Sequence, residues 1–275
     1  MLQLPTVTLC CVDTRSVPQA LEAVHRSTRT IRFGRVLFFG PYGYAHTHLV
    51  NQTPELEWRS IQPLRSIQDY NRFMLQELRQ HVETDHVLVM QWDGFVTNPD
   101  RWQEAFLQWD YIGAPWYHGG RPGQVGNGGF SLRSRRLLDA LAALELNTEV
   151  PEDMEICVHK RDVLATEHGI HIAPLSLAQS FACEYGTYRK AFGFHGMHNF
   201  AHTMTPNELD HWLDGAPAEI LMHQHARKLI KALIEQKRTA EAIGLLDRRR
   251  RLLGTSMDDW SLRARAHLAR LRPAH

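Results

Sequence analysis

The chain has 275 residues, of which 43% are hydrophobic and 22% are charged, and its formal net charge is +1. This length and composition are typical of a folded protein with one large domain, or with one domain and a small appendage. The near-neutral charge offers no field that would attract nucleic acid. No apolar run approaches the roughly 20 residues that a membrane-spanning helix needs, and the first residues lack the basic start and cleavage site of a secretory signal.

The four cysteines follow neither the spacing of a zinc site nor that of a disulfide framework. Cys10 and Cys11 are adjacent in an expected strand, so their side chains face opposite ways, and Cys157 and Cys183 are isolated. We therefore expect reduced thiols and a cytoplasmic protein.

The first part of the chain alternates between strand and helix patterns. Apolar and β-branched residues predict strands at 6–12, 35–39 and 56–61, and a helix is expected over 18–25. Residues 66–82 give the clearest helical pattern, with apolar residues on one side. This alternation predicts an α/β fold, in which helices flank a mostly parallel sheet.

A short apolar run at 87–90 predicts a strand that is buried on both faces of this sheet. It is followed directly by Gln91, Trp92, Asp93 and Gly94. Because ligands of open α/β sheets bind beyond the carboxyl ends of the strands, Asp93 is a candidate for holding a metal ion or a sugar. The alternative is that Asp93 only caps a turn, as Asp-Gly pairs often do.

Asn71 and Arg72 lie near the start of the expected 66–82 helix. An arginine close to a helix N-terminus can bind a phosphate together with the free backbone N–H groups. The alternative is an arginine that points into solvent.

Residues 118–129, HGGRPGQVGNGG, are rich in glycine. We expect a loop there that lets backbone approach a ligand, or that moves as a lid, and the alternative is a flexible hairpin. A helix is expected before it at 99–109, then a strand or loop at 111–116, and a strand that continues into a helix follows within 130–146.

Pro151, Glu152 and Asp153 open another expected helix. Proline followed by acids is ordinary capping chemistry, but one of the acids can also serve as a general base that deprotonates an acceptor hydroxyl. A short strand is expected at 170–174. His195, in the sequence AFGFHG, is a candidate ligand for a divalent metal or a phosphate, or else a hydrogen-bonded histidine in a turn.

Strand patterns stop near 199–217, and residues 218–271 are helical in pattern and rich in arginine. We expect one domain over 1–200 and a helical region over 217–275, whose paired helices faintly resemble a tetratricopeptide unit. The basic run at 247–252 is typical of a solvated helix face, and binding to acidic lipid or to glycan phosphate is the alternative reading.

Several stretches together resemble a family known mainly as a domain of unknown function with glycosyltransferase-like character. They are VDTR, YNRFML, LVMQWDGFV, WDYIGAPW, VGNGGFSLRSRR, PEDMEIC and FGFHG. Their order and spacing also resemble the GT-A glycosyltransferase fold, including its β-1,4-galactosyltransferase branch. The resemblance covers residues 5–199 and implies a nucleotide-sugar donor and a glycan or other hydroxyl acceptor.

In GT-A enzymes a D-x-D motif ends a central strand and binds a divalent cation that bridges the donor phosphates. Gln91, Trp92 and Asp93 occupy this place, so only the second aspartate is present. The resemblance therefore implies a Mn²⁺ or Mg²⁺ site made by Asp93 and His195, with phosphate oxygens and water completing it.

The same resemblance implies roles for further residues. Asp153 is expected to be the general base, with Glu152 orienting the acceptor. The remaining expectations are donor binding by Asp13, Arg15, Asn71, Arg72, Gln91, Asp93, Gly128 and Gly129, and acceptor binding by Trp116 and Phe130.

These observations predict an inverting glycosyltransferase, although the residues leave retention open. Two other classes stay under consideration. One is a nucleotidyltransferase or metal-dependent hydrolase on the same α/β frame, for which the HTH sequence at 46–48 is the closest pair of metal-binding side chains. The other is a non-catalytic nucleotide-sugar or glycan-binding module. Peripheral membrane contact is left open for each of these classes.

Overall fold

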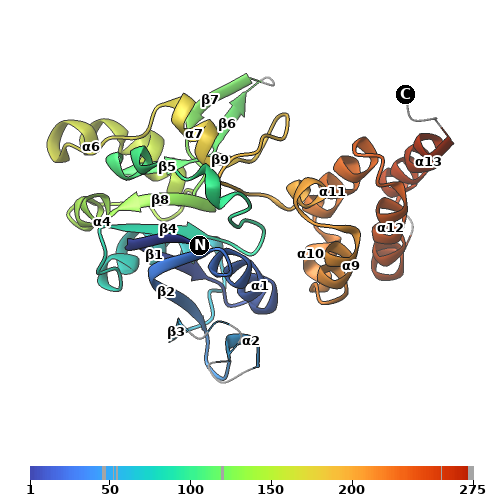
Figure 1. Cartoon of the computed structure of the whole chain (residues 1–275), viewed down its shortest axis with the longest axis horizontal. Coiled ribbons are helices and arrows are strands. Elements are labelled where there is room, and N and C mark those ends of the chain that lie inside the picture. Colours follow the sequence, from blue (N-terminus) through green and yellow to red (C-terminus); the bar gives the residue numbers. More distant parts are fainter. Residues whose placement is uncertain (45–47, 52, 54, 119–120, 255, 272–275) are drawn as a thin grey trace. The chain divides into compact units, whose positions relative to one another are not determined.

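The structure is a computed structural model that describes residues 1–44, 48–51, 53, 55–118, 121–254 and 256–271. The chain divides into two units, Met1–His195 and Gly196–His275. A six-stranded sheet with the order β3-β2-β1-β4-β8-β5 organises the first unit (Figure 1). Its strands are β1 (Leu2–Val12), β2 (Ile31–Pro41), β3 (Leu56–Ile61), β4 (His86–Met90), β5 (Tyr111–Gly113) and β8 (Phe130–Ser134).

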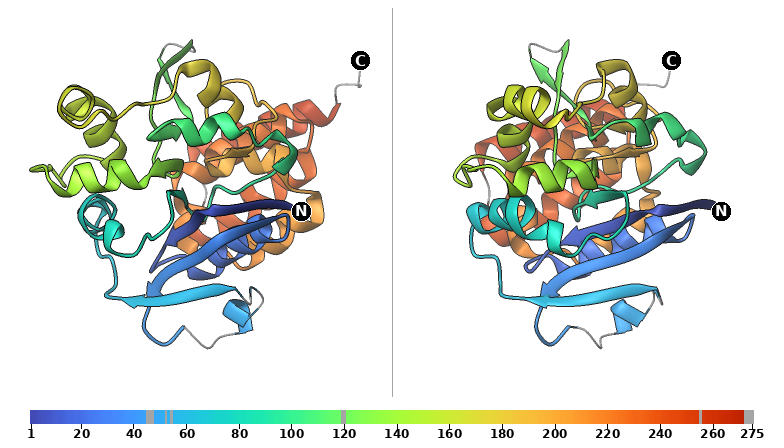
Figure 2. Two further views of the ribbon diagram at one scale, coloured as in Figure 1. Left: turned by 60° about the vertical axis from the view of Figure 1, so that its left-hand side comes forward. Right: turned by 90° about the vertical axis from the view of Figure 1, so that its left-hand side faces the viewer.

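The sheet is mixed. β1 pairs in parallel with β2 and with β4, β2 pairs in parallel with β3, and β8 runs antiparallel to its neighbours β4 and β5. Five of the six strands therefore run in the same direction, which confirms the predicted α/β fold with a mostly parallel sheet. β3 forms one edge, with the short helix α2 (His48–Asn51) beside it (Figure 2).

Helices cover both faces of this sheet. Because successive strand residues point to opposite faces, Val87 and Val89 of β4 face one side, and Leu88 and Met90 face the other. Helix α1 (Val17–Thr28) lies on the second side, where the Ser27 hydroxyl is 3.9 Å from the sulfur of Met90.

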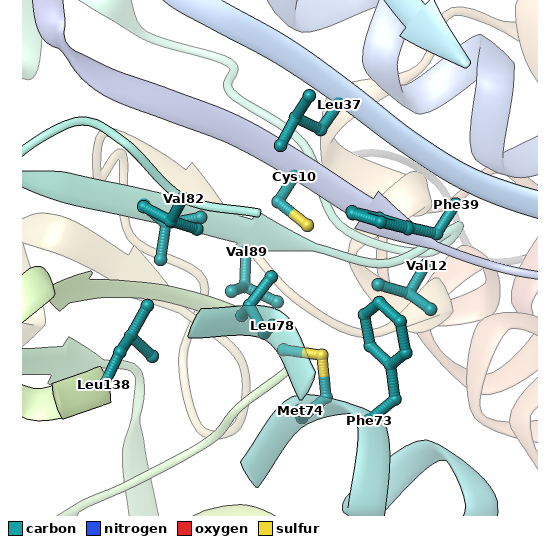
Figure 3. Packing of buried hydrophobic residues seen from close by; sticks show 11 residues of the cluster. Cys10, Val12, Leu37, Phe39, Phe73, Met74, Leu78, Val82, Val89 and Leu138 are labelled. Carbon is teal, nitrogen blue, oxygen red and sulfur yellow. The ribbon is translucent and has the colours of Figure 1, made fainter. Parts of the chain in front are cut away.

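The first side is covered by α4 (Arg135–Ala142) and by a continuous helical segment that follows β3. This segment consists of α3 (Ile67–Arg72), a π-helical turn (Phe73–Glu77) and a 3-10 turn (Leu78–Gln80). The predicted apolar stripe of residues 66–82 forms part of the core cluster in Figure 3, which contains Cys10, Val12, Leu37, Phe39, Phe73, Met74, Leu78, Val82, Val87, Val89 and Leu138.

The prediction of a helix at 99–109 is wrong. Two 3-10 turns, Pro99–Arg101 and Glu104–Gln108, occupy this stretch, and the extended backbone of Trp102 separates them. Trp102 packs edge-on against Phe192, with ring centroids 5.1 Å apart. Aromatic packing at this position therefore replaces a regular helix.

Part of the glycine-rich stretch belongs to a hairpin, which is the alternative structure, and its role as a ligand-binding loop or lid stays a prediction. β6 (Pro115–His118) pairs with β7 (Arg121–Val125) in a separate two-stranded sheet that projects from the main one (Figures 1 and 2). Residues 119–120 of this stretch lie outside the described residues.

The strand predicted at 170–174 contracts to a single bridge between Ile172 and Tyr111. The other elements of the first unit are short. They are α5 (Glu152–Met154), a π-helical turn (Glu155–His159), α6 (Arg161–His168), α7 (Leu175–Phe181), β9 (Ala182–Cys183) and β10 (Gly193–Phe194).

Within its described residues the second unit contains helices and no strands, which confirms the predicted helical appendage. Leu229, Leu233 and Leu246 are buried in its core, whereas Leu253 is exposed. The tetratricopeptide-like pairing stays a prediction. The elements of the second unit are a 3-10 turn (Met197–Asn199), α8 (Phe200–Thr203), α9 (Pro206–Asp214), α10 (Ala218–Met222), α11 (Gln224–Glu235), α12 (Thr239–Leu253) and α13 (Met257–Leu271).

The arginine run on α12 is not one solvated surface. Arg249 is 1% exposed and bonds to Asp259, whereas Arg248 pairs with two acids of α9 and Arg250 is exposed. Among the helices that the structure describes, none combines the length and the apolar character needed to cross a membrane.

Candidate functional site

Polar residues gather at one edge of the sheet because of its strand directions. Asp13 follows β1, and Gln91 and Asp93 follow β4, its parallel neighbour. β8 runs the other way, and its first residue, Phe130, pairs with Met90 at the end of β4. The residues that precede β8, rather than those that follow it, therefore lie at this edge.

His195 reaches the same edge through two short strands. β10 pairs with β9 in parallel, and the His195 backbone N–H donates to the Cys183 carbonyl at 3.0 Å. A bridge between Val96 and Gly193 ties β10 to the segment that follows β4. His195 thus arrives beside Asp93, although the two are far apart in sequence.

The imidazole of His195 is surrounded by polar side chains. Its Nε2 lies 3.2 Å from Asp93 Oδ1 and 3.2 Å from Gln91 Oε1, while its Nδ1 lies 3.2 Å from Glu184 Oε1. Burial alone would lower the pKa of His195, but the carboxylates of Asp93 and Glu184 outweigh it and raise that pKa well above its usual value.

Asn127 supports this arrangement from the turn before β8. Its backbone has φ +59°, in the left-handed region that asparagine tolerates better than most residues. Its Nδ2 donates to Glu184 and lies 3.2 Å from His195 Nδ1. Asn127 and Glu184 therefore fix the orientation of the imidazole ring.

Two glycines allow the chain to pass close to these side chains. A Cβ at Gly129 would lie 2.2 Å from His195 Nε2, and a Cβ at Gly128 would lie 1.7 Å from Glu152 Oε1. Both positions therefore require glycine for steric reasons. This packing accounts for the two glycines that were predicted to line a ligand.

Two distances around Nε2 match both hydrogen bonds and the spacing of neighbouring ligands of a divalent cation. An octahedral Mg²⁺ has metal–ligand distances of about 2.0–2.1 Å, which places neighbouring ligand atoms about 3 Å apart. Asp93 Oδ1 and Gln91 Oε1 both lie close to this separation from His195 Nε2. A metal-binding histidine commonly donates its other N–H to a carboxylate, the position that Glu184 occupies.

Histidine and carboxylate side chains alone do not provide enough ligands for a cation at this position. Within the described part of the chain, no group of three or more His, Cys, Asp or Glu side chains is arranged to hold a metal ion. A cation here would use the Gln91 amide oxygen as its third protein ligand. It would also replace the proton on Nε2 that Asp93 now stabilises. The cation stays a prediction.

The two acids at the start of α5 are in different environments. Asp153 is half-buried, and its Oδ2 accepts a hydrogen bond from the Gly128 backbone N–H at 3.1 Å. Glu152 is buried, and its Oε1 lies 2.8 Å from Nη2 of Arg133. Burial raises the pKa of the Glu152 carboxyl, and Arg133 opposes this change. The neighbouring Asp153 carboxylate adds to the rise.

Arg133 was not identified from the sequence. Its side chain is fully buried, and its guanidinium also donates to Ser131 Oγ at 3.0 Å and to the Gly128 carbonyl at 3.3 Å. Arg133 therefore fixes both the helix start that contains Glu152 and the glycine that holds Asp153.

The predicted donor-binding residues are divided. The Asp13 carboxylate accepts the backbone N–H groups of Arg15 and Ser16 at 2.7 and 2.6 Å, while Arg15 itself is exposed. Burial raises the pKa of Asp13; its hydrogen bonds oppose this, and nearby Asp93 adds to it. Asp13 therefore lies at the same edge as Asp93.

Asn71 and Arg72 do not join this cluster. The Asn71 amide is buried and donates to the carbonyls of Thr148 and Val150, at 3.0 and 2.7 Å, so it ties α3 to the segment before α5. The donor-binding role expected for its side chain stays a prediction. Arg72 is half exposed and lies 3.5 Å from Asp69, and its phosphate contact stays a prediction.

The two predicted acceptor residues also differ. Phe130 is fully buried, with its ring centroid 5.3 Å from that of Phe181, so it belongs to the core and does not line a binding surface. Trp116 is half-buried, and its ring fills the space above Gly126. Only Trp116 stays a candidate for acceptor contact. The 46–48 histidine pair falls outside the described side chains.

The chain belongs to a family described as "Protein of unknown function (DUF5672)", whose profile matches residues 55–195. No curated protein matches the chain. Among solved structures, the chain is similar to that described as "Crystal structure of a glycosyltransferase involved in the glycosylation of the major capsid of PBCV-1". The identity is 11% and the TM-score 0.39, and the match covers 77% of this chain and 98% of that chain.

Proposed function

We propose that the chain is a GT-A-type glycosyltransferase, which transfers a sugar from a nucleotide-sugar to a hydroxyl group with inversion. The main support is the convergence of three side chains at the carboxyl ends of the strands. Asp93 Oδ1 and Gln91 Oε1 each lie 3.2 Å from His195 Nε2. The Gly128–Gly129 dipeptide joins this cluster to Asp153, because Gly129 packs on His195 and Gly128 binds the Asp153 carboxylate.

In this proposal the donor diphosphate lies across the strand ends. Gln91, Asp93 and His195 would hold Mn²⁺ or Mg²⁺ there, and the bound cation would supply positive charge to a leaving diphosphate. Asp13 and the exposed Arg15 follow β1 at the neighbouring strand end, where they contact the base and ribose.

Asp153 accepts the proton of the acceptor hydroxyl as its oxygen attacks the anomeric carbon. Its half-buried carboxylate is oriented by the Gly128 N–H and stays partly accessible. Glu152 cannot share this task, because its carboxylate is buried against Arg133. In place of orienting the acceptor, Glu152 orients the helix start that presents Asp153. Trp116 offers an aromatic surface for the acceptor sugar.

The first test is a thermal-shift screen of nucleoside diphosphates and nucleotide-sugars, each with Mn²⁺, Mg²⁺ or EDTA. A ligand that binds only the folded chain raises the unfolding midpoint. We expect one nucleotide class to raise it in the presence of the cation. The shift should be lost in Asp93→Asn and Gln91→Ala and kept in Asp100→Asn, which changes an exposed acid outside the cluster.

The second test follows the reaction itself. The nucleotide-sugar that binds is incubated with a panel of hydroxyl acceptors, and the anomeric configuration of the product is read by NMR. Inverted product supports the proposal, and retained product contradicts the role of Asp153. Cation-dependent binding without any release of nucleoside diphosphate would indicate a non-catalytic binding module.

A further inference from the structure

The junction of α12 and α13 in the second unit exposes a group of large apolar side chains. Leu252 and Leu253 at the end of α12 are 44% and 46% exposed, and Met257 and Trp260 at the start of α13 are 84% and 62% exposed. Soluble surfaces rarely expose several large apolar side chains within so few residues. We therefore expect another surface to cover these side chains.

The end of α12 protrudes from the helices around it. All residues from Arg250 to Gly254 are exposed, although 3.6 residues complete one helical turn. A turn that packs on a neighbour buries at least one of its residues, as Leu245, Leu246 and Arg249 do earlier in α12. The last turn therefore extends beyond the packed part of the unit.

This protruding surface is positively charged. Arg250 and Arg251 are exposed, and within the described residues neither makes an ion pair or a side-chain hydrogen bond. The acids nearby are already neutralised, because Asp258 lies 2.8 Å from Arg227 and Asp259 bonds to Arg249. Two free guanidinium groups therefore lie in the same sequence segment as the four apolar side chains.

We propose that the end of α12 and the start of α13 dock on an anionic lipid bilayer. We call this surface the apolar–basic tip, and its members are Arg250, Arg251, Leu252, Leu253, Met257 and Trp260. Leucine, methionine and tryptophan side chains insert at the boundary between headgroups and acyl chains, and each nearby arginine is attracted by anionic headgroups. Tryptophan is enriched at this depth of the membrane.

A bilayer fits the tip better than a second copy of the chain does. A two-fold contact through the tip would place Arg250 and Arg251 of both copies close together, where their charges repel. A stable protein interface also buries about 800 Å² per partner, which a six-residue tip does not supply. A bilayer adapts to a protruding surface and supplies negative charge.

The proposal is tested by co-sedimentation of the full chain with two kinds of vesicle. One kind is pure phosphatidylcholine, and the other contains phosphatidylglycerol as the anionic component. We expect binding to the anionic vesicles that weakens as salt is added. Two double variants, Leu252→Ser/Leu253→Ser and Arg250→Glu/Arg251→Glu, should each lower the partition coefficient at least about tenfold.

Matched controls change exposed residues of the same types in the first unit. They are Ile67→Ser, at a side chain 58% exposed, and the double variant Arg65→Glu/Arg161→Glu. The controls should bind vesicles like the parent chain, and circular dichroism melts should show that all variants fold. Vesicle binding unaffected by the tip variants would overturn the proposal. A second result would also overturn it. In that result the parent chain does not bind vesicles but forms a dimer in analytical ultracentrifugation, and Leu252→Ser/Leu253→Ser abolishes the dimer.

Discussion

Arg133 Nη2 lies 2.8 Å from Glu152 Oε1, and the two side chains are 0% and 5% exposed. The pair joins the fourth residue of β8 to the start of α5, directly beside Gly128. A charge buried in this way depends on its partner, because no water replaces the partner when it is removed.

Removing Arg133 alone should therefore strongly destabilise the chain. We expect Arg133→Met to lower the free energy of unfolding by about 3–5 kcal/mol, since it leaves Glu152 buried without its partner. Urea unfolding followed by tryptophan fluorescence measures the change. The control is Arg79→Met, which breaks a pair with Asp139 in which both side chains are more than 40% exposed, and which should cost no more than about 1 kcal/mol. Equal losses in the two variants would contradict the importance of the buried pair.

Gly129 should not tolerate even a methyl group. A Cβ at this position would lie 2.2 Å from the His195 ring, so Gly129→Ala should lower the unfolding midpoint and abolish cation-dependent nucleotide binding. The control is Gly244→Ala within α12, where the nearest atom is 3.7 Å away. That change should stabilise the chain by about 0.5–1 kcal/mol, because alanine favours helix over glycine. Normal nucleotide binding by Gly129→Ala would argue against a site at His195.

Asp153→Asn should separate binding from chemistry. The amide keeps the shape of the carboxylate but cannot accept the acceptor proton, so we expect turnover to fall about 10²–10⁴-fold while the nucleotide-sugar still raises the unfolding midpoint. Asp162→Asn, at an exposed position on α6, provides the control. Near-normal turnover by Asp153→Asn would show that another group is the base.

The cysteine thiols should be unreactive in the folded chain. All four are buried, and burial raises the pKa of Cys10 from 9.0 to about 12. At pH 8 the thiolate fraction of Cys10 should then be about 1000-fold below that of an ordinary cysteine. Ellman's reagent should therefore react slowly with the native chain and with four thiols after unfolding in guanidinium chloride. Rapid native reaction of any thiol would contradict its burial.

The sequence predicted the strand ends well because their signals are local. The apolar run before Gln91 and the change to polar residues after it follow from the burial of β4 on both faces, so Asp93 could be placed without a structure. The proximity of Asp93 to His195 could only be expected by resemblance, since nothing in the intervening sequence specifies it.

Arg133, Asn127 and Glu184 were missed for a different reason. An arginine in a strand usually reaches solvent, and only the acid at Glu152, from a separate element, makes its burial tolerable. Asn127 was read as part of a glycine-rich loop, and the local signal was its residue type, because asparagine tolerates the positive φ that the structure shows there. Glu184 follows a two-residue strand, which is too short to produce a recognisable pattern.

The contact between His195 and Gln91 has a consequence for biosynthesis. The two residues are 104 positions apart in sequence, and His195 is the last residue of the first unit. During synthesis, the cluster at the strand ends therefore stays incomplete until His195 has left the ribosome. Contacts between such distant residues form late, because the entropy of closing the long loop must first be overcome. A nascent chain can therefore complete its six-stranded sheet before the cluster of Gln91, Asp93 and His195 is assembled.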